Sequence, residues 1–362
     1  MKIFSMEKLP ADELAALPKK ERIAYKKKRR TFKRIRALAV LGVLIIIIAL
    51  GITSCVKGHG KGERLPESDP NQDIQEEVVT SAAIDFTKTA ATKDITVDIG
   101  SQYAILVNAD SKEIAAVKGD IDKRIYPASM TKVLSLLVAS ETITDWTKSV
   151  YMTRDIEEYC YVNECSNVGY SRDEIMALSE LPYGTILTSG ADATLGMALY
   201  AVDPAGTSGK SFEELHKAYA DLMNKKVKDL GLKNTHFTNA VGIHAEDHYT
   251  TTKEMALIMY AAMADDFSRK ILTTPGFETA PTEQHPQGQV LSNLFIRKIS
   301  SKDCGNANVI AAKTGYVEEA GFCAVSYATA SDGTGYICVT ASGTGTNNSI
   351  SDHAAIYKAY VK

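Results

Sequence analysis

The sequence is poor in the residues that build metal and redox centres. Its six cysteines never form a Cys-x-x-Cys pair, so the spacing of a structural zinc site is missing. Cys160 and Cys165 are close enough along the chain to form a disulfide in an exported protein, and free buried thiols are the alternative. We predict no metal site and no cofactor. The cysteines stand at positions 55, 160, 165, 304, 323 and 338.

Histidine is scarce as well, with seven residues in the whole chain. Two of them, His244 and His248, are four residues apart with acidic neighbours, a spacing that on a helix can suit a metal ion. The segment lies between Gly242 and Thr250 and lacks the glutamate placement of zinc proteases. It therefore predicts a solvated loop near the rim of a site.

The main part of the chain has no excess of positive charge. Residues 56–362 carry 28 basic and 40 acidic residues, whereas residues 1–36 carry 13 basic and four acidic ones. The basic character is thus confined to one end of the chain. This distribution argues against nucleic acid as a partner of the folded part.

Residues 37–55 lack charge altogether and are strongly apolar. With Val56 the run reaches the ~20 residues that a helix needs to cross a bilayer core. Lys/Arg-rich flanks stay in the cytoplasm. We predict a basic cytoplasmic tail (1–36), a transmembrane helix (37–56) and a single-pass protein of the cell membrane whose remainder lies outside. A buried core helix, a cleaved signal peptide and a lipoprotein processed at Cys55 are the alternatives.

Residues 57–95 are rich in Gly, Pro, Ser, Thr and acidic residues, and we expect an extracellular linker there. Order is expected from near Tyr103, within one domain spanning 96–362. Strand patterns at both ends of this domain favour one antiparallel sheet, and the helical patterns between them favour a second lobe, an α+β fold. The expected strands are 103–108, 113–117, 309–313, 321–328 and 335–341; the expected helices are 129–140, 212–230, 251–262 and 351–360.

One chemical motif opens the first of these helices. Ser129 and Lys132 are three residues apart, which places them on one helix face, so the amine can reach the hydroxyl and accept its proton. Free backbone N–H groups at the helix start add positive potential near Ser129. The motif alone is weak, because a second copy, Ser5-Met-Glu-Lys8, occurs in the basic tail.

Two further motifs follow. Lys313-Thr-Gly315 ends an apolar strand, where a lysine, a hydroxyl and a glycine can bind a carboxylate and admit a ligand backbone. Ser189 lies 60 residues after Ser129 and 124 residues before Lys313. In this order the three motifs resemble the S-x-x-K, S-x-N and K-T-G set of β-lactamases and penicillin-binding proteins.

The sequence around the motifs resembles that of the low-molecular-mass D-alanyl-D-alanine carboxypeptidase family, over about residues 100–345. The resemblance implies an α+β domain of the β-lactamase/DD-peptidase type, with a five-stranded antiparallel sheet flanked by helices and an all-α lobe. The matching segments are 104–110, 126–132, 183–190, 238–242, 248–250 and 313–321.

The same resemblance implies a serine carboxypeptidase that removes the terminal D-alanine from peptidoglycan stem peptides and binds β-lactams covalently. Ser129 would be acylated, Lys132 would accept its proton, and Ser189 would relay a proton to the leaving D-alanine. Lys313, Thr314 and Gly315 would bind the substrate. The N–H groups of Ser129 and Tyr316 would form the oxyanion hole.

The chain departs from the family pattern at Ala191, where S-x-N has its asparagine. That amide normally binds the base lysine and the substrate peptide. A weakened homologue that only binds peptidoglycan or β-lactams therefore stays open as an alternative to a carboxypeptidase. A β-lactamase is a second alternative, although no motif resembles the glutamate loop of the class A enzymes.

Overall fold

The computed structural model describes residues 84–362, apart from the side chains of 346–348. The predicted basic tail (1–36), transmembrane helix (37–56) and most of the predicted linker (57–83), with Ser5 and Cys55, lie outside the described residues. Among the residues that are described, none of the helices is long and apolar enough to cross a membrane.

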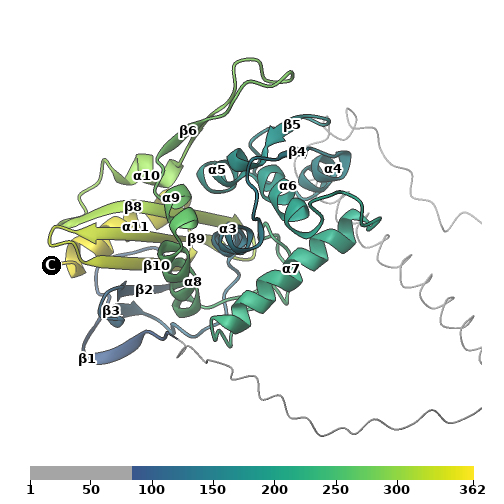
Figure 1. Cartoon of the computed structure of the whole chain (residues 1–362). Helices are drawn as coiled ribbons and strands as arrows, with labels where there is room; N and C mark the ends of the chain where they lie inside the picture. The colour runs from purple at the N-terminus through teal and green to yellow at the C-terminus, as the bar shows by residue number, and fades with distance from the viewer. Residues whose placement is uncertain (1–83) are drawn as a thin grey trace, which may run out of the picture. The chain divides into compact units, whose positions relative to one another are not determined.

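A mixed sheet forms one half of the described domain (Figure 1). Neighbouring strands pair antiparallel from β3 to β8, as expected. The predicted number of five strands is wrong, because β1 pairs parallel with β3 at the edge, within residues 84–362. The spatial order is β1 (Thr87–Asp94), β3 (Glu113–Lys118), β2 (Tyr103–Asn108), β10 (Gly335–Gly343), β9 (Gly321–Ala330) and β8 (Ala307–Val317).

β1 lies inside the stretch expected to be linker up to residue 95. Its sequence, TKTAATKD, is polar, and six of its eight residues are exposed, so it shows no apolar alternation. Phe86, directly before it, is fully buried and meets Tyr260 edge-on with ring centroids 6.0 Å apart. One buried aromatic ring and pairing to β3 therefore order a segment that composition alone assigns to a linker.

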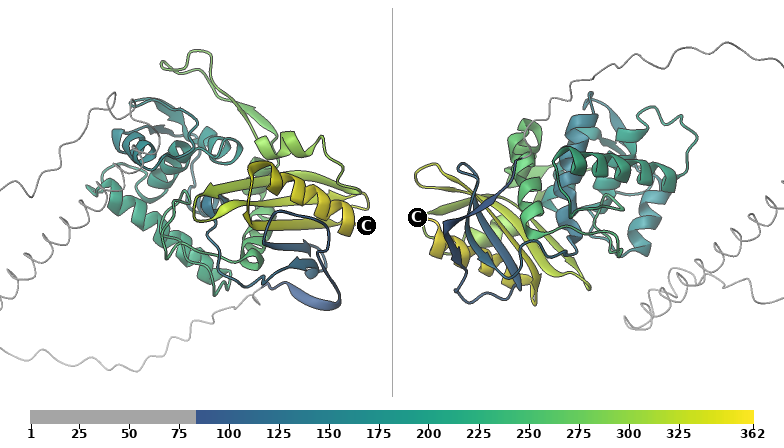
Figure 2. Two further views of the ribbon diagram at one scale, coloured as in Figure 1. Left: turned by 180° about the vertical axis from the view of Figure 1, so that it is seen from behind. Right: turned by 90° about the horizontal axis from the view of Figure 1, so that it is seen from below.

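Both faces of the sheet are covered, which is why β2 is apolar at consecutive positions. Ala104 and Leu106 face one core together with α10 (Leu294–Ile299) and α11 (Thr346–Tyr360), whereas Ile105 and Val107 face the larger core. All four side chains are fully buried, as expected for a strand whose alternate residues point to opposite covered faces. Figure 2 shows α11 lying along one face of the sheet.

The second half is helical and surrounds α3 (Thr131–Thr142), which follows a short 3₁₀ turn, η1 (Ala128–Met130). Its first nine residues are all buried. The larger core joins α3 to the apolar face of the sheet. The other helices are α4 (Arg154–Val162), α5 (Leu181–Leu187), α6 (Ala191–Val202), α7 (Phe212–Asp229), α8 (Thr252–Ala264) and α9 (Asp266–Leu272).

One 3₁₀ turn and two short strand pairs complete the fold of the described residues. They are the 3₁₀ turn η2 (Leu178–Glu180), the pair β4 (Ser149–Tyr151) with β5 (Ile175–Ala177), and the pair β6 (Gly276–Glu278) with β7 (Val290–Ser292). The long hairpin between β6 and β7 projects from the sheet in Figure 1, and its His285 ring contacts the Glu174 carboxylate at 2.8 Å.

Three buried histidines make this fold sensitive to acid. Burial lowers the pKa of His216 to about 4 and the pKa values of His248 and His353 to about 3. An unfolded histidine titrates near pH 6.5, so the unfolded chain binds about three protons that the folded chain excludes. Their contribution to stability is therefore complete above pH 6.5 and is lost as the pH falls toward these lowered values.

We predict that the free energy of unfolding drops by about 4 kcal/mol from pH 6 to pH 5. Urea titrations followed by the fluorescence of Trp146, the single tryptophan, would measure it. This ring stacks on Phe267 at 4.4 Å and should report unfolding. His353→Gln should reduce the slope by about one third, since one of the three titrating groups is gone. Equal stability at the two pH values would contradict the prediction.

Candidate active site

Ser129 sits in a sharp turn at the start of α3. Ala128 before it has a φ of 47°, a left-handed conformation that is rare for residues with a side chain and that marks strain at functional sites. The Met130 N–H donates to the Pro127 carbonyl at 3.1 Å and closes the turn. Ser129 is half-buried, so its hydroxyl is presented at the surface of a site and not enclosed in the core.

Two glycines let neighbouring backbone approach this turn. A Cβ on Gly242 (φ 87°) would lie 1.9 Å from the Ala128 carbonyl oxygen. A Cβ on Gly315 would lie 2.8 Å from the Pro127 carbonyl oxygen and 2.7 Å from the Cys323 sulfur. Both positions exclude any larger residue. β8 and the loop at Gly242 therefore press against the turn that bears Ser129.

Lys132 lies beside the Ser129 hydroxyl. Its side chain is 2 % exposed, and its Nζ donates to Ser129 Oγ at 3.0 Å and to the Val241 carbonyl at 2.8 Å. Burial lowers the pKa of Lys132 to about 8, while Cys165, Cys160 and Asp192 act weakly in the opposite direction. A substantial fraction of this amine is thus neutral near pH 8 and able to accept the Ser129 proton.

The Val241 carbonyl is itself fixed by Asn239. Asn239 Oδ1 accepts from three backbone N–H groups, those of residues 241, 242 and 243, at 3.2, 2.7 and 3.0 Å. Its Nδ2 donates to the Ile243 carbonyl at 2.8 Å. One buried amide side chain therefore shapes the loop that presents a hydrogen-bond acceptor to the Lys132 amine.

His248 ties this loop to α3. Its Nε2 lies 2.8 Å from Thr131 Oγ1, and its Nδ1 accepts from the Thr238 N–H at 3.0 Å. The segment between His244 and His248 is a loop, as predicted, but His248 is 1 % exposed and turns inward, against the prediction of a solvated segment. His244 packs edge-on against Tyr126, with ring centroids 4.4 Å apart.

A second serine–lysine pair faces the first. Lys313 Nζ donates to Ser189 Oγ and to the Thr314 carbonyl, both at 2.8 Å, and its side chain is 2 % exposed. Burial, and then the positive charge of neighbouring Lys132, lowers the pKa of Lys313 well below its ordinary range. Ser189 has a φ of 60°, a second left-handed residue at the site.

The structure thus brings together the sequence-predicted residues Ser129, Lys132, Ser189 and Lys313. Thr314, Gly315 and Tyr316 continue along β8, the outermost strand of the described sheet on this side. Tyr316 is 55 % exposed and its ring stacks on Phe322 at 4.4 Å. The arrangement joins a hydroxyl with its base, a second hydroxyl with a lysine, and an open strand edge, a combination suited to acyl transfer.

Ala191 and Asp192 both make structural contacts. Ala191 is 1 % exposed and belongs to the larger core. The Asp192 carboxylate accepts from the N–H groups of Val168, Gly169 and Tyr170 at 2.9, 2.9 and 3.2 Å. Asp192 therefore holds the 168–170 backbone, and Lys132 has its hydrogen bonds elsewhere.

Sequence reasoning did not assign a role to Asn239, Val241 or His248. All three lie in segments, 238–242 and 248–250, that carry the family resemblance, and this was the available signal. Val241 acts through its backbone carbonyl, which no residue-type argument can find. Asn239 and His248 are positioning residues whose partners come from loop folding.

Comparison with known proteins finds one family model and several relatives that match the chain. The family model described as D-alanyl-D-alanine carboxypeptidase matches residues 87–343. D-alanyl-D-alanine carboxypeptidase DacF of Bacillus subtilis is 27% identical over 223 residues, 62% of this chain and 52% of that protein. DacA of Escherichia coli K12 is 27% identical over 243 residues, 64% of this chain and 53% of that protein. The chain thus spans about half the length of these two relatives.

The fold matches a solved relative as well. The crystal structure of the Streptomyces K15 DD-transpeptidase is 25% identical, with a TM-score of 0.63, and the match covers 72% of this chain and 97% of that one.

We predict that Asn239→Ala lowers the free energy of unfolding by about 3 kcal/mol, because three buried N–H groups lose their acceptor. Denaturant titration would measure the change. Asn239→Asp keeps the accepting oxygen and should cost clearly less, although it loses the donor to the Ile243 carbonyl. An alanine variant as stable as the parent would refute the assignment.

Proposed function

Since this chain belongs to the D-alanyl-D-alanine carboxypeptidase family, we propose that it removes the terminal D-alanine from peptidoglycan stem peptides through an acyl-enzyme on Ser129. One observation carries the proposal: two serine–lysine hydrogen bonds, Ser129–Lys132 at 3.0 Å and Ser189–Lys313 at 2.8 Å, occur in one site. In such a site one pair can activate the nucleophile and the other can protonate the leaving amine.

In the first step, neutral Lys132 takes the Ser129 proton as Oγ attacks the carbonyl carbon between the two terminal D-alanines. The Ser129 and Tyr316 N–H groups would bind the developing oxyanion. The close approach of β8 to the turn at Ser129, which Gly315 permits, supports this placement. The Val241 carbonyl keeps the Lys132 amine directed at Oγ while the charge on that amine changes.

In the second step, the carbon–nitrogen bond breaks and the leaving D-alanine amine takes a proton. We assign this relay to Ser189, whose Oγ is bound to Lys313 Nζ. The proton that Lys132 received would return through Ser189 to the amine. Water would then attack the Ser129 ester, restoring the hydroxyl and releasing the shortened peptide.

Lys313 and Thr314 would hold the free carboxylate of the substrate. Burial disfavours the charged form of Lys313, and an arriving carboxylate would supply the opposite charge that favours it. β-Lactams carry a strained amide beside a carboxylate, so we propose that they acylate Ser129 in the same way. Lys132 keeps two partners without the asparagine of S-x-N, which supports an active enzyme over a weakened homologue.

We further propose that residues 37–56 span the cell membrane, with the N-terminus in the cytoplasm and the catalytic domain outside. The uncharged run beside 13 basic residues supports this orientation. Peptidoglycan lies on that outer side, so the location places the site with its substrate. A lipoprotein processed at Cys55 is the alternative mode of attachment.

A labelling experiment tests the function. The full-length chain in detergent would be incubated with a fluorescent penicillin and, separately, with a pentapeptide ending in D-Ala-D-Ala. We expect covalent label and released D-alanine, both abolished in Ser129→Ala. Ser5→Ala is the matched control, because Ser5 belongs to the second S-x-x-K copy. It should keep both activities.

Other outcomes would change the conclusion. Absence of both label and D-alanine would refute the enzyme assignment, and fast turnover of penicillin would indicate a β-lactamase. In membranes, the labelled chain should sediment with the lipid, and a chain lacking 37–56 should stay in the supernatant. Sedimentation of both would argue against anchoring by this segment.

We predict that the rate of acylation rises with pH through a midpoint near 8, the lowered pKa of Lys132. The neutral amine is the base, so the reactive fraction grows as the pH increases past this value. Stopped-flow labelling between pH 6 and pH 9.5 would measure it. Circular dichroism over the same range is the control for folding. A rate that falls across this range would contradict Lys132 as the base.

A further inference from the structure

The C-terminal end of α4 brings two cysteines together. Glu164 follows the helix with a φ of 52°. The Cys165 N–H donates to the Cys160 carbonyl at 3.0 Å, and the Glu164 N–H donates to the Tyr161 carbonyl at 3.3 Å. These two hydrogen bonds around the left-handed Glu164 form a Schellman motif. In this motif the residue that follows the left-handed one contacts the third-last residue of the helix.

The two residues in those positions are Cys165 and Cys160. Their thiols are hydrogen-bonded to each other, and this contact together with burial raises the pKa of Cys160. Cys160 is buried and Cys165 is half-buried. Both side chains are in the thiol form. The turn therefore brings the two thiols into hydrogen-bond contact, and a disulfide requires such close approach.

The backbone that follows the turn supports the active site. The Ser166 carbonyl accepts from the Ala191 N–H at 2.7 Å. The N–H groups of residues 168, 169 and 170 donate to the Asp192 carboxylate. Residues 165–170 therefore form a supporting wall, joined by hydrogen bonds to the segment from Ser189 to Asp192.

We propose that Cys160 and Cys165 form a disulfide that closes the turn after α4 and fixes the wall behind Ser189. The proposal rests in part on the proposed location outside the membrane, where disulfides persist. The oxidant is an external disulfide, such as that of a thiol–disulfide oxidoreductase or of oxidised glutathione.

The chemistry is a double exchange. The accessible Cys165 sulfur attacks the external disulfide as a thiolate and releases one thiol. The Cys160 sulfur then attacks the mixed disulfide and releases the second thiol. Two cysteine thiols are oxidised, one disulfide is reduced, and the two protons leave with the reduced oxidant. A cavity beside Cys160, lined also by Met152, Asn167 and Tyr170, gives that sulfur room to move.

The pairing would distinguish these cysteines from the other three of the described chain. Cys304, Cys323 and Cys338 are buried free thiols, and the Cys323 sulfur donates to the Pro127 carbonyl at 3.3 Å. The sequence offers a direct readout, because residues 155–172 form one tryptic peptide that contains both Cys160 and Cys165. Residues 303–313 form another that contains Cys304 alone.

Peptide mass spectrometry tests the proposal without any measurement of activity. The full-length chain would be treated with oxidised glutathione or with reductant, denatured, alkylated and digested. After oxidation we expect peptide 155–172 without alkyl groups and lighter by about 2 Da than the calculated dithiol mass, because two hydrogens are lost. After reduction it should carry two alkyl groups. The Cys304 peptide should be alkylated in both samples.

Two alkyl groups, or two bound glutathiones, on peptide 155–172 after oxidation would overturn the proposal. In Cys160→Ser, Cys165 should instead retain one glutathione. Because none of these readouts uses Ser129, failure of the disulfide and failure of the proposed function remain distinguishable.

Thermal unfolding measures the effect on the fold. A ring of this size should raise the melting temperature by roughly 4 °C in the oxidised chain. The matched control is the double variant Cys160→Ser, Cys165→Ser, whose melting temperature should not respond to the oxidant. Hydrogen exchange of residues 165–170 should slow in the oxidised wild type only. An unchanged or lower melting temperature after disulfide formation would contradict the role as a support.

Discussion

The burial of two lysine amines is the constraint on which this site depends. Lys132 and Lys313 are each 2 % exposed, and a charged amine is strongly disfavoured in such surroundings. Each has the same two compensating partners, one serine hydroxyl and one backbone carbonyl. Burial opposes the charge and the carbonyls favour it, so each amine is held where a small change in its surroundings alters its protonation. A base and an anion-binding group can thus be built from the same residue type.

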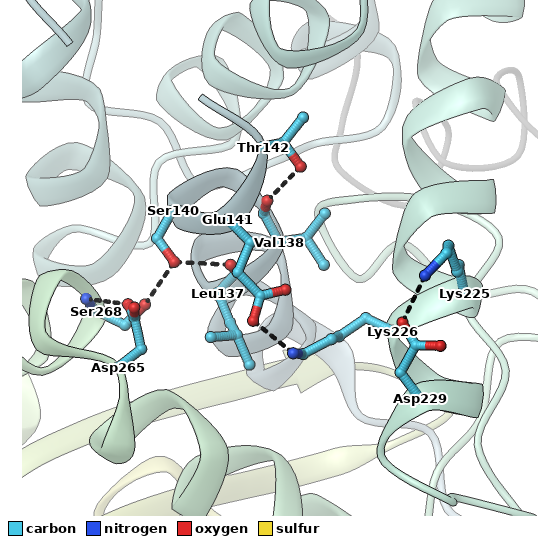
Figure 3. Close-up of polar contacts among 10 residues, drawn as sticks. All are labelled: Leu137, Val138, Ser140, Glu141, Thr142, Lys225, Lys226, Asp229, Asp265 and Ser268. Carbon is cyan, nitrogen blue, oxygen red and sulfur yellow. Dashed lines mark hydrogen bonds and ion pairs between the residues drawn. The ribbon is translucent and has the colours of Figure 1, made fainter. Parts of the chain in front are cut away.

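The rest of the domain keeps these partners in place. The first nine residues of α3, which include Lys132, are buried, and Ser135 among them has its partners within the protein. Ser135 Oγ donates to the Ala240 carbonyl at 2.6 Å, and Tyr219 Oη donates to the Ser135 carbonyl at 2.5 Å. Figure 3 shows the far end of α3.

At that end Glu141 pairs with Lys226 of α7, and Ser140 Oγ lies 3.4 Å from Ser268 Oγ of α9. Asp265 caps α9 by accepting from the Ser268 N–H at 2.7 Å. A helix fixed at both ends presents the Ser129 hydroxyl with little freedom to move, which is what a preorganised nucleophile requires.

Sequence patterns predicted the elements that bury an apolar stripe or alternate along a covered sheet, such as α7 and β2. They also identified the Ser129–Lys132 pair, because fixed spacing and residue type carry that chemistry, whereas Ser189 and Lys313 were assigned through the family resemblance. They could not identify β1, whose polar residues owe their order to pairing with β3 and to Phe86. They could not identify the Val241 carbonyl either, since every residue has one and only the folded loop directs it at Lys132.

The position of β1 has a mechanical consequence. β1 and β8 are the two opposite edges of the described sheet, so the strand nearest the N-terminal part of the chain is the one farthest across the sheet from Lys313. A force applied to the chain before Phe86 would act first on three contacts. These are the buried Phe86 ring, the Lys253–Asp85 ion pair and the irregular pairing of β1 with β3. β1 pairs with β3 alone, so its loss would leave the pairing among the five antiparallel strands intact. In the membrane-anchored arrangement proposed above, this outer strand would take up tension before the tension reaches Ser129 and Lys132.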